Sequence, residues 1–299
     1  MLKKIAQLTG HNASIFALSA TDSERYFLSG AGDGWVVRWD LENPDMGKLV
    51  AKVETQIFSL LYLKGQQKVV VGNMNGGVHW VDLEMPEKTI NIAHHQKGVY
   101  AIIEIGPYVY TAGGQGMLTR WDKESGRSLE SMQVSHQSLR ALTYCPQRHE
   151  LAVGASDHAI YILDADSLVV KKAILKAHDN SVFSLCYNPD GGLLLSGGRD
   201  AHLKAWDTQA DYLLLSSQPA HLFTLNAIVF HPNGQYFATA SRDKNIKIWE
   251  TATFRLLKVL ESYRDESHLN SVNCLYWSGH KNTLISGSDD RSLIVWKEN

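Results

Sequence analysis

The sequence has little of what a disulfide-stapled, secreted chain needs. Its 299 residues include 3 cysteines, Cys145, Cys186 and Cys274, which lie far apart and form no CxxC pair. Sparse, unclustered thiols indicate reduced, packed side chains, and therefore a reducing compartment such as the cytoplasm. No apolar segment follows Lys3 and Lys4, so we expect no secretory signal.

An excess of charge of one sign is also missing. The 29 Lys and Arg residues nearly balance the 31 Asp and Glu residues, for a net charge of −2. Nucleic acid and membrane surfaces are therefore not expected partners, because neither finds a basic footprint. The longest stretch without a charged residue, 212–241, contains Pro219 and Pro232 and does not read as a membrane helix.

What the sequence does contain is a repeat of about 43 residues. Each unit ends on an apolar residue, Trp in five of the seven units, followed by a charged residue: Trp39-Asp40, Val81-Asp82, Trp121-Asp122, Leu163-Asp164, Trp206-Asp207, Trp249-Glu250 and Trp296-Lys297. The steps between them are 42, 40, 42, 43, 43 and 47 residues. Seven such units account for the chain, so we expect one domain over residues 1–299.

The spacing inside the units is regular as well. Six residues before each closing position stands a turn residue: Asp33, Asn75, Gln115, Asp157, Asp200, Asp243 and Asp290. An apolar anchor stands 18 residues before that turn residue in six units, and 16 before it in the third: Ile15, Ile57, Val99, Leu139, Val182, Leu225 and Val272. Between these points, short runs alternate at period two and are separated by Gly, Asp, Asn and Pro. Four short strands per unit predict an all-β, seven-bladed β-propeller with four-stranded antiparallel blades.

These residues resemble the WD-repeat family over the entire chain. The opening Gly10-His11, the Trp-Asp closures and the Asp at a fixed distance before them match the family motif. The resemblance implies that the N-terminal strand, within residues 1–9, completes the last blade, which otherwise ends after its third strand. Closing the ring in this way removes two open sheet edges.

Four units carry a Ser or Thr, a His, an Asp and a Trp at constant spacing. A single set resembles a hydrolase triad, but four copies argue for a structural device, since an active site is normally single. The resemblance implies a buried hydrogen-bond network of these residues: His11, Ser29, Asp33 and Trp39; His178, Ser196, Asp200 and Trp206; His221, Thr239, Asp243 and Trp249; His268, Ser286, Asp290 and Trp296.

The second, third and fourth units depart from this pattern. Gln115 replaces Asp in the third, the fourth has Ser135 at the His position, and the second keeps nothing of the quartet. We therefore expect these three blades to be softer. No second ligand pair accompanies His94 and His95, as a zinc site requires. His95 fits the blade network of the third unit, so His94 is expected to be a loop residue.

The resemblance also implies which residues face a partner, namely those after the apolar anchors and those before the turn residues. The candidates for this face are Phe16, Phe58, Met74, Tyr100, Arg140, Phe183, Arg199 and Arg242. Aromatic and Arg side chains are enriched in interface hot spots. Two alternatives stay open: the aromatic rings pack inward as core, and the arginines only pair with acids of neighbouring turns.

The sequence therefore predicts a monomeric, non-enzymatic scaffold that binds a protein or peptide, with neither metal nor cofactor. Guanidinium groups beside aromatic faces suit an acidic or phosphorylated partner. The alternative is small-ligand binding or enzymatic activity at the mouth of the central channel. The charged segment 261–270, which lengthens the last step, is either a partner-specific lip or a solvated loop.

Overall fold

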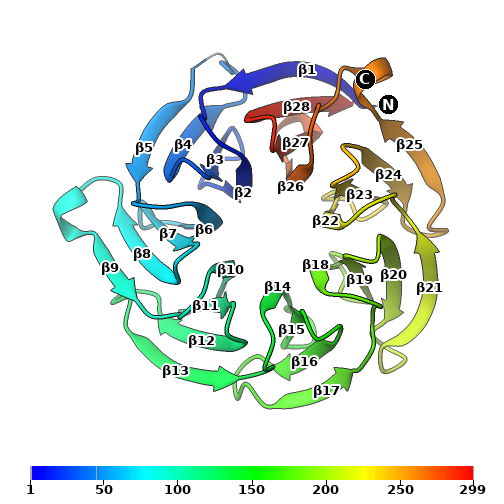
Figure 1. The fold of residues 1–299 in the computed structure, drawn as a ribbon, viewed down its shortest axis with the longest axis horizontal. Coiled ribbons are helices and arrows are strands. Elements are labelled where there is room, and N and C mark those ends of the chain that lie inside the picture. Colours follow the sequence, from blue (N-terminus) through cyan, green and yellow to red (C-terminus); the bar gives the residue numbers. More distant parts are fainter. Residues whose placement is uncertain (1, 45, 299) are drawn as a thin grey trace.

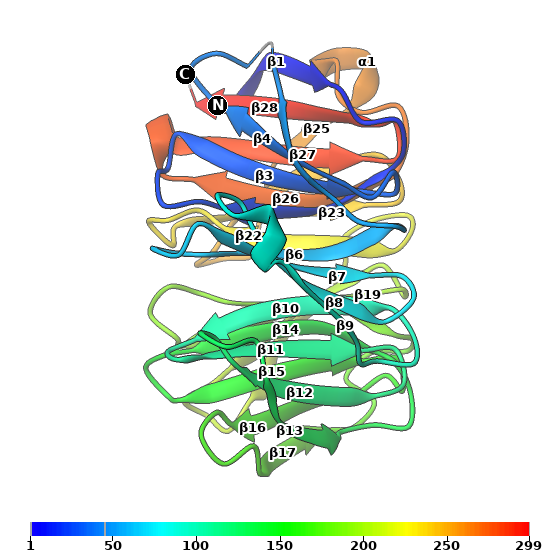
Figure 2. The ribbon, with the colours of Figure 1, turned by 90° about the vertical axis from the view of Figure 1, so that its left-hand side faces the viewer.

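A computed structural model describes residues 2–44 and 46–298 as a ring of seven four-stranded antiparallel sheets around a central channel (Figure 1). Seen edge-on, the ring is a disc with loops on its two faces (Figure 2). This architecture confirms the predicted all-β, seven-bladed propeller. We number the blades 1 to 7 in chain order from the first innermost strand.

Consecutive strands form each blade, running from the channel outward. Blades 1 to 3 consist of β2 (Ile15–Ala20), β3 (Tyr26–Ala31), β4 (Trp35–Asp40) and β5 (Lys48–Lys52); β6 (Ile57–Leu63), β7 (Lys68–Asn73), β8 (Gly77–Asp82) and β9 (Ile90–Ala93); and β10 (Val99–Ile105), β11 (Tyr108–Gly113), β12 (Met117–Asp122) and β13 (Ser128–Gln133). Blades 4 and 5 consist of β14 (Leu139–Cys145), β15 (Glu150–Ala155), β16 (Ile160–Asp164) and β17 (Val170–Ile174); and β18 (Val182–Tyr187), β19 (Leu193–Gly198), β20 (His202–Asp207) and β21 (Leu213–Pro219). Blades 6 and 7 consist of β22 (Leu225–Phe230), β23 (Tyr236–Ser241), β24 (Ile246–Glu250) and β25 (Leu256–Leu260); and β26 (Val272–Ser278), β27 (Thr283–Ser288), β28 (Ser292–Glu298) and β1 (Leu2–Thr9).

Three short helical turns interrupt the loops: η1 (Pro86–Lys88), α1 (Ser262–Asp265) and η2 (His280–Asn282). The segment that lengthens the last repeat contains α1, and it is tied down rather than freely solvated. Asp265 pairs with Lys258 of β25 at 3.1 Å, and the Lys4 ammonium donates to the Glu266 carbonyl at 3.0 Å.

Burial follows the position of a strand in its blade. The second strand is buried almost throughout, as in β19 and β27, because both of its faces meet a neighbouring blade. The outermost strand, such as β13, is mostly exposed. Successive side chains of a strand point to opposite faces, so a blade is apolar on both sides and buries them only between two neighbours.

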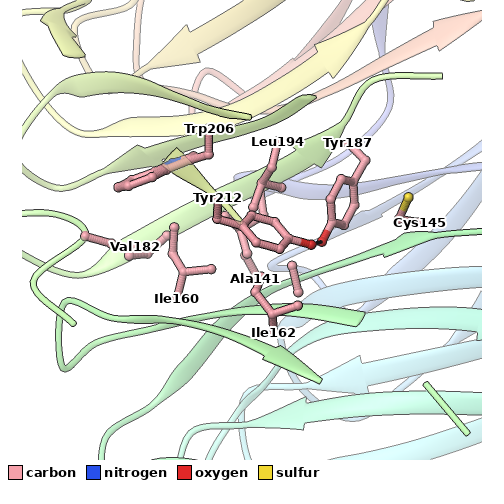
Figure 3. Close-up of a cluster of buried hydrophobic side chains, with 12 residues drawn as sticks. Ala141, Cys145, Ile160, Ile162, Val182, Tyr187, Leu194, Trp206 and Tyr212 are labelled. Atoms are coloured by element: carbon pink, nitrogen blue, oxygen red, sulfur yellow. Dashed lines mark hydrogen bonds between the residues drawn. The ribbon is translucent and has the colours of Figure 1, made fainter. Parts of the chain in front are cut away.

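The contact between blades 4 and 5 shows how polar groups enter this packing (Figure 3). The phenol groups of Tyr187 and Tyr212 meet at 2.7 Å, and Tyr212 donates to the buried Glu150 carboxylate at 2.6 Å. Arg148 donates to the same carboxylate at 2.8 Å. Burial and the neighbouring Glu150 raise the pKa of Tyr212, so that it stays protonated as a donor. Nearby Cys145 is one of three free cysteines.

Strand β1 closes the ring by pairing with β28, as predicted. The antiparallel register runs from Leu2 opposite Glu298 to Thr9 opposite Ser292. Leu2 and Leu8 are buried, and the blade 6 residue Lys258 donates to the Leu2 carbonyl at 2.7 Å. Met1 of the expected segment 1–9 lies outside the described residues.

Ring closure by β1 can be tested with two apolar residues of that strand. Leu8→Ala should lower the free energy of unfolding by about 2–5 kcal/mol, because it empties a buried site. Ile5→Ala is the matched control: its side chain is exposed, so the change should stay within about 0.5 kcal/mol. Deleting residues 2–9 should lower the melting temperature sharply. Equal unfolding curves for the deletion variant and the full chain would contradict a closing role for β1.

Candidate functional site

Blade 5 contains one of the four predicted quartets in full. His178 Nδ1 lies 3.0 Å from the Asp200 carboxylate, and His178 Nε2 lies 2.8 Å from Ser196 Oγ. Trp206 Nε1 donates to the same hydroxyl oxygen at 2.9 Å, and the Asp179 backbone N–H donates to Asp200 at 2.9 Å. The loop before the blade is thereby tied to its second and third strands. The same contacts join His11, Ser29, Asp33 and Trp39; His221, Thr239, Asp243 and Trp249; and His268, Ser286, Asp290 and Trp296.

The geometry of the quartet favours a structural role over a catalytic one. Each Ser or Thr hydroxyl accepts from a Trp N–H and bonds to the His ring, so the hydroxyl is held in place by two buried partners. Ser29, Ser196, Thr239 and Ser286 are fully buried, at 0% exposure, so no substrate reaches their hydroxyl oxygens. A nucleophile needs that access.

Titration within the quartet is set by burial and by donors. In blade 6, burial lowers the pKa of His221, whose neutral ring donates from Nδ1 to Asp243. Burial acts to raise the pKa of the Asp243 carboxyl. The hydrogen bonds from His221 and from the backbone of Leu222 and Asn245 outweigh it and hold the pKa below its ordinary range. The pair therefore consists of a neutral His221 and an ionised Asp243, and N–H donors stabilise the buried charge of the carboxylate.

Blades 2 to 4 contain substitute networks that the repeat alignment did not reveal. Their shared position lies four residues after the turn residue, on the third strand, and is occupied by His79, Thr119 and Tyr161. In blade 2, His79 bridges Asn73 at 2.8 Å and Asn91 at 2.7 Å. The available signal was a His, Thr or Tyr at this position, where the blades with the full quartet have Val37, Lys204, Lys247 and Ile294.

In blade 4, Ser135 and Tyr161 both donate to Asp157, at 2.5 and 2.7 Å. Burial and the neighbouring carboxylate raise the pKa of Tyr161 to about 12. The phenol therefore replaces the missing imidazole as a donor that stays protonated.

Blade 3 uses an amide in place of the carboxylate. The Gln115 side-chain amide lies 3.0 Å from His95 Nδ1, and His95 Nε2 lies 2.8 Å from the Thr111 hydroxyl. Burial, together with the neighbouring His94, lowers the pKa of His95 to about 4. His94 lies in the loop between β9 and β10, as expected. Its ring is not free there, since it packs edge-on against Trp121 at 4.6 Å and bonds to Thr119 at 3.0 Å.

The seven residues that follow the apolar anchors come together at one end of the channel. They line a single hollow, which we call the channel-mouth surface: Phe16, Phe58, Tyr100, Arg140, Phe183, Asn226 and Asn273. Each comes from the start of an innermost strand, and these strands surround the channel in Figure 1. All seven are half-buried, with part of each side chain open to the hollow rather than packed fully inward.

Blades 1 to 5 contribute a continuous stack of side chains to this surface. The rings of Phe16 and Phe58 meet edge to face at 5.4 Å, and Phe58 stacks on Tyr100 at 5.4 Å. The Arg140 guanidinium lies over Tyr100 at 4.0 Å and near Phe183 at 5.4 Å. Each contact joins neighbouring blades, so the stack has a fixed geometry before any partner binds.

Blades 6 and 7 complete the hollow with amides that bond to their neighbours. Asn226 donates to the Val272 carbonyl of blade 7 at 2.9 Å, and Asn273 donates to the Ile15 carbonyl of blade 1 at 3.1 Å. The amide N–H groups of Asn226 and Asn273 are used in these bonds between blades. The side chains free to contact a partner therefore gather on blades 1 to 5.

Met74, Arg199 and Arg242, the predicted face residues that precede the turn residues, do not line the hollow. They lie exposed on the same face. A backbone hydrogen bond repeated in all seven blades places them there. In blade 5, the backbone N–H of Arg199 donates to the carbonyl of Ser181 at 2.9 Å, two residues before the channel-mouth residue Phe183. The equivalent residues of the other six blades form the same bond. The turns therefore surround the hollow.

The arginines of this face have no acidic partner among residues 2–44 and 46–298. No carboxylate there lies within 4.0 Å of Arg140, Arg199 or Arg242. Arg140 donates instead to the Ser156 hydroxyl at 3.2 Å. Pairing with turn acids, the alternative left open by the sequence, does not occur.

Neither a metal cluster nor a membrane-spanning helix is present among the described residues. No cluster of three or more His, Cys, Asp or Glu side chains in the described chain could hold a metal ion. None of the described helices has the length and apolar character needed to cross a membrane.

Replacing the shared hydroxyl should destabilise a blade. Ser196→Ala leaves the Trp206 N–H and the His178 ring without their hydrogen-bond partner. Each unsatisfied buried group costs about 1–3 kcal/mol of folding free energy. Chemical denaturation should therefore show a loss of about 2–5 kcal/mol. Ser217→Ala, on the exposed outer strand of the same blade, is the control and should change stability little. A similar small effect from both changes would rule out the network as a source of stability.

The depressed pKa of His95 predicts loss of stability in acid. The unfolded side chain titrates near 6.5 and the folded one at about 4, so the unfolded state binds more protons below pH 6.5. Stability is full above pH 6.5 and falls by about 2 kcal/mol from this residue between pH 6.5 and 5. Urea unfolding of His95→Gln should show a shallower pH dependence than the wild type. Parallel profiles would contradict the assignment, and an NMR titration of the wild-type ring gives an independent reading.

Comparison with known proteins agrees with this geometry. The chain is 30% identical over 296 residues to the WD repeat-containing protein SL1-17 of Schistosoma mansoni, covering 99% of this chain and 83% of that protein. It is 31% identical over 104 residues to the ribosome biogenesis protein ytm1 of Aspergillus oryzae, a match over 34% of this chain that spans only 21% of that protein.

A solved structure has the same fold. The crystal structure of the WD40 β-propeller domain of Doa1 superposes with a TM-score of 0.87 at 18% identity, over 100% of this chain and 97% of that one. The family described as WD domain, G-beta repeat (WD40) matches residues 2–40, 170–207, 213–250 and 257–297. With these matches and its seven closed blades, the chain belongs to the WD40 repeat family.

Proposed function

We propose that this protein is a non-enzymatic scaffold that binds a protein or peptide partner through the channel-mouth surface. The observation that carries the proposal is the stack from Phe16 to Phe183, in which an unpaired Arg140 lies between two aromatic rings. Aromatic and Arg side chains provide most of the energy in interface hot spots. Because neighbouring blades hold the stack in place, little side-chain entropy is lost on binding.

The chemistry of the lining favours binding over catalysis. Of the seven side chains, only Tyr100 and Arg140 are titratable, and no carboxylate, imidazole or thiol lies among them. A general base or nucleophile is normally one of those groups. Small-ligand binding at the channel mouth, the alternative from the sequence, lacks a comparable observation and is an outcome of the test below.

The partner we propose is acidic or phosphorylated. Arg140, Arg199 and Arg242 are unpaired cations on one face, and guanidinium groups form strong, directional hydrogen bonds with carboxylates and phosphates. We further propose one propeller domain over residues 1–299, monomeric by itself and resident in the cytoplasm. The three free cysteines and the net charge of −2 support the compartment and the exclusion of nucleic acid.

Capture from the native cell lysate tests the proposal. The wild type should retain a protein that Tyr100→Ala/Arg140→Ala loses, with at least tenfold weaker binding of the purified partner, as expected for removal of hot-spot residues. The control is Tyr26→Ala/Arg38→Ala, a Tyr and Arg in contact at 5.3 Å that do not line the channel mouth.

Three outcomes are distinguishable. A partner lost by both double variants, or by neither, would move the site away from the channel mouth. A small metabolite recovered with the wild type, and no protein, would favour the alternative function. Circular dichroism of each variant establishes that it remains folded.

A further inference from the structure

Blades 6 and 7 expose three large apolar side chains on the face that contains the channel mouth. Leu222 is 82% exposed, Phe223 58% and Leu269 66%. We call these three residues the blade 6–7 patch. Leu222 and Leu269 occupy the same repeat position, directly after the network histidines His221 and His268. Polar residues occupy this position in blades 1 to 5: Asn12, Glu54, Gln96, His136 and Asp179.

The exposure of the patch is built into the blade network. The Leu222 backbone N–H donates to Asp243 at 3.0 Å, and the Leu269 backbone N–H donates to Asp290 at 3.1 Å. Ser241 also donates from its hydroxyl to the Phe223 carbonyl at 3.1 Å. The backbone and the preceding His are held inward, so the apolar side chains point to solvent from rigid loops. Leu222 and Phe223 are adjacent, and contiguous exposed apolar side chains are typical of interaction surfaces.

Three cations without acidic partners lie on the turns that bond to the loops of the patch. Arg242, Lys244 and Arg291 flank Asp243 and Asp290, and no carboxylate of the described chain lies within 4.0 Å of any of them. Lys244 and Arg291 are also exposed. The turns that contain these cations bond directly to the patch loops, since the Arg242 N–H donates to the Thr224 carbonyl at 3.0 Å.

The acids near the patch already have partners within the chain. Glu261 pairs with Arg264 at 3.6 Å, Asp265 with Lys258 at 3.1 Å and Glu266 with Lys4 at 3.8 Å. On the turn of blade 7, the half-buried Asp289 accepts from the Asn273 amide at 2.7 Å. None of these acids lies within 4.0 Å of the patch cations, which leaves the three cations without a carboxylate partner in the described chain.

We propose that the blade 6–7 patch docks an acidic segment of a partner protein whose Leu- or Phe-type side chains cover Leu222, Phe223 and Leu269. Charge complementarity selects the partner: Asp or Glu residues beside those apolar groups meet the three unpaired cations. The inference rests on the proposed function, since it uses the same face, and it adds a second contact region beside the channel mouth. Separate regions on one rigid ring let a partner engage both at once.

A random dodecamer peptide library displayed on phage is the probe. Selection on the wild-type protein should enrich peptides that combine Asp or Glu with Leu or Phe. Synthetic copies of these peptides should bind Leu222→Ser/Phe223→Ser/Leu269→Ser at least tenfold more weakly. The peptides should also bind Lys244→Glu/Arg291→Glu more weakly, a variant that leaves Arg242 of the proposed function unchanged. The matched control is Leu213→Ser/Leu215→Ser, which removes two exposed leucines from the outer strand of blade 5 and should leave binding unchanged.

The channel-mouth variant Tyr100→Ala/Arg140→Ala separates this inference from the proposed function. Peptides of the patch should still bind that variant. Peptides that lose affinity for it, but not for the patch variants, would overturn the patch and leave the proposed function standing. Peptides without acidic residues, or no enrichment at all, would also overturn the inference.

Two further measurements address the other possible occupants. Sedimentation velocity would reveal a dimer that the patch variant abolishes, and flotation would reveal binding to phosphatidylserine–phosphatidylcholine vesicles. Either result, without acidic peptides that bind the patch, would overturn the proposal in favour of a second copy or of a lipid surface. Circular dichroism and the melting temperature establish that each surface variant is folded.

Discussion

The structure depends on the burial of both faces of every blade. A four-stranded sheet of this kind is apolar on each side, and in a ring its only covering is the pair of neighbouring blades. Such an arrangement is satisfied only when the ring closes, because an open ring exposes one face at each end. Pairing of β1 with β28 supplies the last strand of blade 7 and brings distant parts of the chain together. The stability of each blade is therefore coupled to that of its neighbours.

Within each blade, a buried polar network positions the loops. The His rings, hydroxyls, indoles and carboxylates form a chain of hydrogen bonds from the entering loop to the second and third strands. A buried carboxylate is tolerated because N–H groups donate to it. Blades 2 to 4 reach the same result with other residues, for example a phenol in place of the imidazole at Tyr161. In every blade the polar groups of this network are hydrogen-bonded to one another, but the residue types that form these bonds differ between blades.

One face of the disc gathers the groups suited to a partner because the repeat returns the chain to that face seven times. The loops that precede the innermost strands and the turns after the second strands meet there through the same backbone hydrogen bond. Differences between blades then give the face its chemistry. Blades 1 to 5 supply aromatic rings and Arg140 at the channel, and blades 6 and 7 supply leucines and unpaired cations on the loops. A rigid frame presents both without reorganisation.

The number of blades and their strand order were readable in the sequence, because the units repeat at fixed spacing and both local alternation and turn chemistry follow from neighbouring residues. The closing strand, the quartet network and the end of the channel at which the residues after the apolar anchors gather came from the resemblance to the WD-repeat family. Three features became visible only in the folded chain: Arg140 lies between Tyr100 and Phe183, His79 and Tyr161 replace missing partners, and Leu222 and Leu269 face solvent. Those facts depend on contacts between blades or across strands, where the distance, the angle and the burial of each side chain are set by how the blades pack around the ring.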